Sequence, residues 1–200
     1  MIYRFLVKIP VVGVVIKIMN AYAYHGDFDA DNRFASVWAW LRAYLAGVLV
    51  SVVLAAFLTP SIPNMFLPHC IRLDYTVTVM PGDLATGILP NLLGFGIGVY
   101  ALVFALDRSL VKDLQATFQG SGKPSIPGSV LLLNAEMALP LIMLIAAIVV
   151  GVMQKVFPNS VLLIAGSWFT FWLSIYFILG LVHSLFMMVD VHLSQRLKDN

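Results

Sequence analysis

Residues 87–106 read GILPNLLGFGIGVYALVFAL, a run of twenty residues without a charged side chain. As a helix, such a run is long enough to cross a bilayer core about 30 Å thick. The same run contains a proline, an asparagine and four glycines, all of which weaken an isolated helix. We therefore expect a membrane span whose small residues serve contact with another helix.

The composition of the whole chain is that of a membrane protein. Of its 200 residues 60% are hydrophobic and 11% are charged, and the mean hydropathy is +0.93. These values exclude an ordinary soluble domain, and the length allows one compact helical bundle. Four stretches are long and apolar enough to span, at about 38–58, 84–106, 130–153 and 161–189. The sequence thus predicts an all-α integral membrane protein, a single membrane domain over residues 1–200 with four transmembrane helices.

Lysine and arginine are distributed unevenly between the two sides of these spans. Ten of the twelve fall on the side of the two termini, and only Arg72 and Lys155 fall in the other two loops. Positive charge is retained on the cytoplasmic side of a membrane protein. Both termini, including a tail over 190–200, are therefore predicted to be cytoplasmic, and the last apolar stretch is long enough to project past the bilayer.

The first 35 residues are predicted to lie at the cytoplasmic interface as an N-terminal interfacial segment. Their apolar core, residues 9–16, is too short for a span and contains Pro10 and Gly13, which argues against a cleaved secretory signal. On one continuous helix, Lys17 would point nearly opposite to Arg4 and Lys8, so the segment is not cleanly amphipathic.

Two local signals lie beside the spans. Asp31 or Asn32 is expected to cap the first long helix, because short polar side chains accept hydrogen bonds from free amides there. In the loop between the first two spans, RLDYTVTV at 72–79 alternates polar and apolar residues and predicts a short strand.

The small residues of the second span share one side of its helix. At about 100° per residue, six of them fall within about 80° of arc. This small-residue face consists of Gly87, Asn91, Gly94, Gly98, Ala101 and Ala105. Flat faces favour helix association in membranes, and Asn91 adds a hydrogen-bonding group. The partner is either another helix of the same subunit or a second subunit around an oligomer axis, and Gly96, on the opposite side, is left for another contact.

Three ionisable residues are predicted to share a polar layer near the cytoplasmic side: Arg42, Glu136 and His183. Glu136 lies about 9 Å into the third span. Ionisable groups inside a membrane are costly unless paired or hydrated, so it is a candidate site. Pro140 lacks the amide that would bond the carbonyl of Glu136. Three interpretations remain open: a static pair with Arg42 or His183, a proton-sensitive switch, and an ion pathway.

The remaining motifs do not support catalysis, a cofactor or a metal. GSGKPS at 120–125 lacks the first glycine and the Ser or Thr of a phosphate-binding loop, and the acidic turn at 27–31 lacks the later ligands of a calcium loop. His183 and Ser184 are adjacent and point about 100° apart, so they cannot form a nucleophile and base pair. The net charge of +2 is not clustered, which argues against direct nucleic-acid binding.

The size, the four spans, the cytoplasmic ends and the stretch ILPNLLGFGIGVYAL together resemble the small membrane subunit of the Kiwa antiphage defence system of bacteria. That resemblance implies a non-enzymatic, homo-oligomeric sensor of the bacterial inner membrane, with a tetramer expected, that works with a cytoplasmic DNA-binding partner. A small ion channel or transporter with Glu136 in its pathway is the alternative, and a membrane enzyme comes last.

Overall fold

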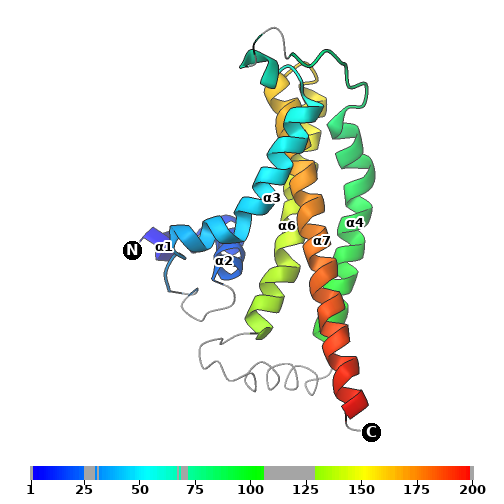
Figure 1. The fold of residues 1–200 in the computed structure, drawn as a ribbon. Helices are drawn as coiled ribbons and strands as arrows, with labels where there is room; N and C mark the ends of the chain where they lie inside the picture. Colours follow the sequence, from blue (N-terminus) through cyan, green and yellow to red (C-terminus); the bar gives the residue numbers. More distant parts are fainter. Residues whose placement is uncertain are drawn as a thin grey trace. The chain divides into compact units, whose positions relative to one another are not determined.

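The structure is a computed structural model that describes residues 2–24, 30, 32–66, 68, 72–105 and 129–198. All of the regular structure in these residues is helical, which confirms the all-α fold. The elements are α1 (Ile2–Leu6), α2 (Val12–Ala23), α3 (Val37–Leu58), the 3₁₀-helix η2 (Pro63–Met65), α4 (Pro81–Ala105), α6 (Ser129–Val156) and α7 (Val161–Lys198) (Figure 1).

Four of these helices, α3, α4, α6 and α7, are long and apolar enough to cross a membrane. Their candidate spans are Val37–Leu58, Pro81–Leu102, Asn134–Val156 and Val161–Met187, within a few residues of those expected from hydropathy. α7 has 38 residues and is therefore about 57 Å long, well beyond the thickness of a bilayer core.

The first long helix begins later than its sequence suggests. The backbone N–H of Ala39 donates to Ser36 Oγ over 3.2 Å, so Ser36 is the capping side chain and α3 begins at Val37. Of the two predicted caps, Asn32 precedes Ser36 and does not cap α3, and Asp31 lies outside the described residues. The reason lies in Asn20, whose buried side-chain amide forms hydrogen bonds with the backbone of Ala30, Arg33 and Ala35. These bonds hold the residues before Val37 outside α3.

The predicted strand at 72–79 is also wrong, since residues 72–78 adopt no regular secondary structure and pair with no strand among the described residues. An isolated strand has no ladder to satisfy its backbone. Instead, the side chain of Asn64 bonds both the N–H and the carbonyl of Leu73, at 2.8 and 2.9 Å. Tyr75 donates its hydroxyl proton to the carbonyl of Phe57. Side-chain contacts thus replace the missing strand.

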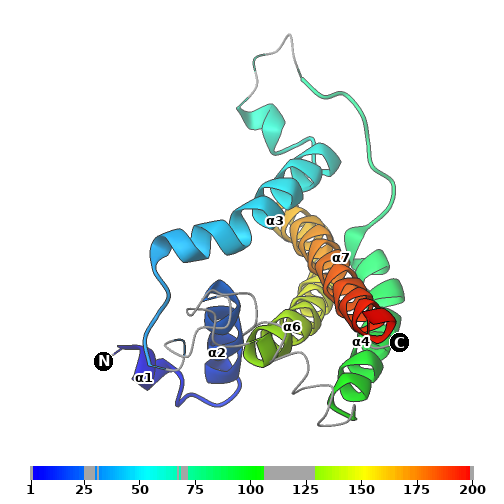
Figure 2. The ribbon, with the colours of Figure 1, turned by 60° about the horizontal axis from the view of Figure 1, so that its bottom comes forward.

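The chain divides into two compact units, the first formed by residues 1–43, 104–140 and 177–200 and the second by 44–103 and 141–176. In the second unit α3 packs on α7 at Gly47, where an added Cβ would lie 2.8 Å from Tyr176 Cδ1. In the first unit, α1, α2 and the residues leading into α3 lie together (Figure 2). There the ring of Tyr22 meets the ring of Phe177 edge to face, with centroids 5.9 Å apart.

Candidate functional site

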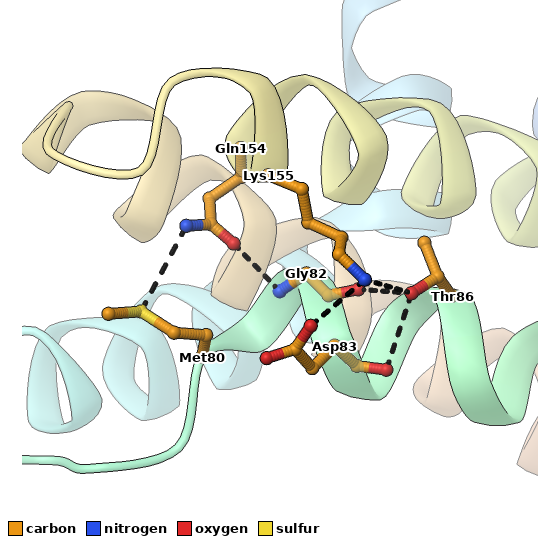
Figure 3. Close-up of polar contacts among 6 residues, drawn as sticks. All are labelled: Met80, Gly82, Asp83, Thr86, Gln154 and Lys155. Atoms are coloured by element: carbon orange, nitrogen blue, oxygen red, sulfur yellow. Dashed lines mark hydrogen bonds and ion pairs between the residues drawn. The ribbon is translucent and has the colours of Figure 1, made fainter.

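The second unit fixes α4 to α6 through a polar contact at the beginning of α4. The N–H of Gly82 donates to Gln154 Oε1 over 3.0 Å (Figure 3). An amide in the first turn of a helix has no partner within that helix, so Gln154 supplies the acceptor. Gln154 is only 1% exposed, and its Nε2 lies 4.0 Å from Met80 Sδ, which makes this a buried and directed contact.

The two helices also approach each other closely beside this contact. A Cβ added at Gly82 would lie 2.6 Å from the carbonyl oxygen of Gly151, and one added at Gly151 would lie 2.6 Å from Ala85 Cβ. Further along α4, a Cβ at Gly96 would lie 2.6 Å from Leu141 Cδ2. The packed face of α4 therefore consists of the buried residues Gly82, Ala85, Leu89 and Gly96. The expectation of a separate contact at Gly96 is confirmed.

An exposed ion pair lies beside the contact between Gly82 and Gln154. Lys155 Nζ lies 3.0 Å from Asp83 Oδ1 and 3.4 Å from Thr86 Oγ1. The Thr86 hydroxyl in turn donates to the carbonyl of Gly82 over 2.8 Å (Figure 3). The side chains of the ion pair are 49% and 63% exposed, so this contact contributes much less than the buried Gln154 bond.

The small-residue face of α4 lies on the other side of the helix. At about 100° per residue its centre is about 170° from that of the packed face. A Cβ added at Gly87, Gly94 or Gly98 would meet nothing within 4 Å. Asn91 and Ala101 are exposed. Ala105 is the last residue of α4, and the structure describes its backbone only. The described part of the chain thus leaves this face open.

A ridge of bulky side chains borders the small-residue face. Ile88, Phe95 and Leu102 recur every seven residues and are exposed, Phe95 by 70%. Ridges beside a flat strip of small residues are the surface that a neighbouring helix packs into. We did not predict this ridge, although its seven-residue spacing was visible in the sequence.

Asn91 lies near the middle of the candidate span Pro81–Leu102 and is exposed. Its side chain makes no hydrogen bond to any described residue. An amide facing hydrocarbon without a partner costs several kcal/mol on water-to-alkane scales, about 4–8. This position is therefore the one on the small-residue face that most requires a partner.

In the first unit, Glu136 on α6 has a partner on α7. Ser184 Oγ donates to Glu136 Oε2 over 2.8 Å, and both side chains are half-buried. Within the described residues Glu136 forms no ion pair with Arg42 or His183, which are both exposed. One interpretation of the sequence paired Glu136 with Arg42 or His183, whereas the residue that bonds the carboxylate is Ser184, which follows His183 on α7. Pro140 lies inside α6 one turn further on and is buried.

No group of three His, Cys, Asp or Glu side chains suited to a metal ion occurs among the residues that the structure describes. Comparison of the chain with known protein families, with curated proteins and with solved structures gives no match. Function must therefore be inferred from the residues themselves.

Proposed function

We propose that this chain is a homo-oligomeric, multi-pass subunit of the bacterial inner membrane, with both termini in the cytoplasm, that acts as a non-catalytic sensor or scaffold. The observation that supports it is the small-residue face of α4, which is open along its described length and carries Asn91 in mid-span. Such a face is suited to close contact with another helix.

A second copy of the same chain is the partner that fits this face best. An asparagine amide both donates and accepts, so Asn91 of one copy can bond Asn91 of another around a symmetry axis. The glycines allow the two backbones to approach, and the ridge of Ile88, Phe95 and Leu102 packs beside them. Lipid chains offer the amide no hydrogen bond.

The cytoplasmic partner is proposed from the resemblance to the Kiwa membrane subunit. In this proposal the subunits form a tetramer, respond to a phage-associated disturbance of the membrane and control a soluble DNA-binding effector. The basic loops and tail on the side of the termini would provide the docking surface. The four apolar helices are consistent with the membrane part of this proposal.

A phage challenge tests this function. Cells expressing the chain with its neighbouring genes are infected with a panel of phages and plaques are counted. The wild type should reduce plaque numbers, the double variant Gly94→Leu, Gly98→Leu should lose the reduction, and Gly180→Leu should keep it. Gly180 is a matched control because a Cβ there also meets nothing within 4 Å. Equal plaque numbers with and without the chain, for every phage, would refute the role in defence.

A small ion channel or transporter is the second candidate, and Glu136 favours it. Of its two carboxylate oxygens only Oε2 accepts a hydrogen bond from a described residue, so Oε1 is available to a cation or a proton. Proteoliposomes loaded with an ion-sensitive dye should then show a flux that Glu136→Gln reduces at least about tenfold, as expected for an ionisable residue in a membrane pathway. Absence of flux in the wild type would remove this candidate and leave the scaffold.

A further inference from the structure

The N-terminal part of the first unit contains a set of buried hydrogen bonds around Asn20. Asn20 is fully buried, and its Nδ2 donates to the carbonyls of Ala30 and Arg33, each at 2.9 Å. Its Oδ1 accepts from the N–H of Ala35 over 2.8 Å. The hydroxyl of Tyr3 donates to the same carbonyl of Ala30 over 2.7 Å. α1 and α2 are thereby fixed to the backbone directly before the first span, α3.

Apolar side chains, in contrast, point outward from the turn between α1 and α2. Ile9, Val11, Val12 and Val14 are all exposed, Val11 by 75% and Val14 by 60%. We call residues 9–14 the apolar turn. A segment that faces water normally buries its large apolar side chains and exposes polar side chains such as the amide of asparagine. Here the arrangement is reversed, and contiguous exposed apolar surface of this kind marks contact with a membrane or another protein.

The backbone of the apolar turn is strained at its most exposed residue. Val11 has φ 65° and ψ −60°, and the N–H of Val12 donates to the carbonyl of Pro10 over 2.7 Å. This is a γ-turn of the rare and strained form, in a conformation that is unfavourable for a β-branched residue. Two residues after Val11, position 13 must be glycine, because a Cβ at Gly13 would lie 2.2 Å from the carbonyl oxygen of Val7.

A glycine at position 11 would adopt this conformation without strain. The turn nevertheless presents a valine to its surroundings, so turn formation alone does not explain the residue. The valine side chain contributes a favourable free energy that offsets this strain only if it is removed from water. This strain and the reversed distribution of polar groups are two separate observations that point to an apolar environment outside the turn.

We propose that the apolar turn inserts into the bilayer leaflet at which α3 begins. Continuity with the first span selects lipid over a protein partner, because Asn20 holds α2 against Ala35, two residues before Val37 opens α3. Exposed Lys8, at the edge of the turn, then lies at the level of the lipid headgroups, where a lysine is favoured. The break between α1 and α2 also means that Lys17 does not lie on one continuous helix with Arg4 and Lys8, the arrangement in which it would point nearly opposite to them. This inference does not depend on self-association through α4.

The test places an environment-sensitive dye on the turn. The sole cysteine, Cys70, is replaced by serine, Val11→Cys is introduced and labelled with NBD, and the protein is reconstituted into vesicles containing lipids with a nitroxide near the headgroup. Two labelled controls accompany it. Asp74→Cys, exposed in the loop between α3 and α4, reports water, and Val53→Cys, exposed within the candidate span of α3, reports lipid.

The emission of the dye at residue 11 should be blue-shifted like that at residue 53, and the nitroxide should quench it at least about twice as strongly as the dye at residue 74, as expected for a side chain below the headgroups. Emission like that of residue 74 would overturn the proposal. A blue-shifted emission without quenching would show that protein covers the turn, and would overturn the proposal equally.

A second variant separates insertion from folding. Val11→Gly relieves the strain and removes the side chain, so the fold should be retained while NBD at Val12→Cys is quenched less than in the parent with Val11. A circular dichroism spectrum and an assembly mass equal to those of the parent protein establish that each variant is folded. Equal quenching of residue 12 in both backgrounds would contradict a role of the Val11 side chain in insertion.

Discussion

The two faces of α4 have similar composition and opposite surroundings. The packed face, Gly82, Ala85, Leu89 and Gly96, lies against α6, where a Cβ at Gly82 would lie 2.6 Å from backbone and one at Gly96 would displace the end of the Leu141 side chain. On the small-residue face, a Cβ at Gly87, Gly94 or Gly98 would meet nothing within 4 Å. Glycine content alone therefore does not tell which face packs within the chain.

Polar groups distinguish the two faces. On the packed side the N–H of Gly82 has an acceptor in Gln154, supplied by the same chain. On the small-residue face, the amide of Asn91 has no partner among the described residues although it lies in mid-span. In hydrocarbon an unmet hydrogen-bonding group is costly, so we propose that the second face takes a partner from outside the subunit. The comparison predicts that bulk added to the packed face damages folding and that bulk added to the small-residue face damages assembly.

Gly151→Leu should have the largest effect on the subunit itself. The new side chain would overlap Ala85 Cβ, which already lies 2.6 Å from an ideal Cβ at this position. Overpacking of this kind costs about 1–3 kcal/mol or more, because the backbones must separate. The measurement is the yield of monodisperse protein in mild detergent, with Gly166→Leu as the control because its Cβ would be in open space. Equal yields would show that α4 and α6 are not in close contact.

Gln154→Leu should have the next largest effect. It keeps the volume of a buried side chain but removes the acceptor for the N–H of Gly82. A buried donor left unsatisfied costs about 1–3 kcal/mol. The midpoint of thermal unfolding in detergent should therefore fall. A leucine variant as stable as the wild type would contradict the role given to this amide.

Asn91→Leu should weaken assembly and leave the subunit folded. Hydrogen bonds between membrane helices contribute about 0.6–2 kcal/mol each, so the monomer fraction at a fixed detergent ratio should rise several-fold. Asn91→Gln is the matched variant, since it preserves the amide. If the leucine variant assembled as well as the wild type while the glutamine variant did not, the polar contact between copies would be excluded.

Lys155→Ala should have the smallest effect. Its ion pair with Asp83 is largely exposed, and pairs of this kind contribute about 0–1 kcal/mol. The midpoint of thermal unfolding of this variant should differ little from that of the wild type. Added salt should change the midpoint of the wild type equally little. A large drop would mean that the alkyl stem of Lys155, near Gly82, contributes packing that the ion pair does not explain.

Much of the fold could be predicted because hydropathy reports span length directly. The four long helices and the contact at Gly96 follow from apolar runs and from the 100° turn per residue. Contacts that depend on a single polar side chain could not be predicted. Asn20 moves the start of α3 to Val37, Asn64 replaces a strand partner, and Gln154 reaches an amide that lies 72 residues away in the sequence.

The same distinction applies to the residues of the candidate sites. The small-residue face is a property of one helix, so periodicity locates it. The partner of Glu136 belongs to another helix, and its identity depends on the rotation of α7. Ser184 rather than His183 faces the carboxylate, a difference of one residue that no pattern within either helix specifies.

The central claim is that the small-residue face of α4 joins copies of this chain. The most direct measurement is the mass of the assembly in mild detergent, by native mass spectrometry, for the wild type, for Gly94→Leu with Gly98→Leu, and for Gly180→Leu. We predict an oligomer for the wild type and for Gly180→Leu, and a folded monomer for the double variant. A double variant with the same mass as the wild type would contradict the claim, and so would a wild type that is monomeric.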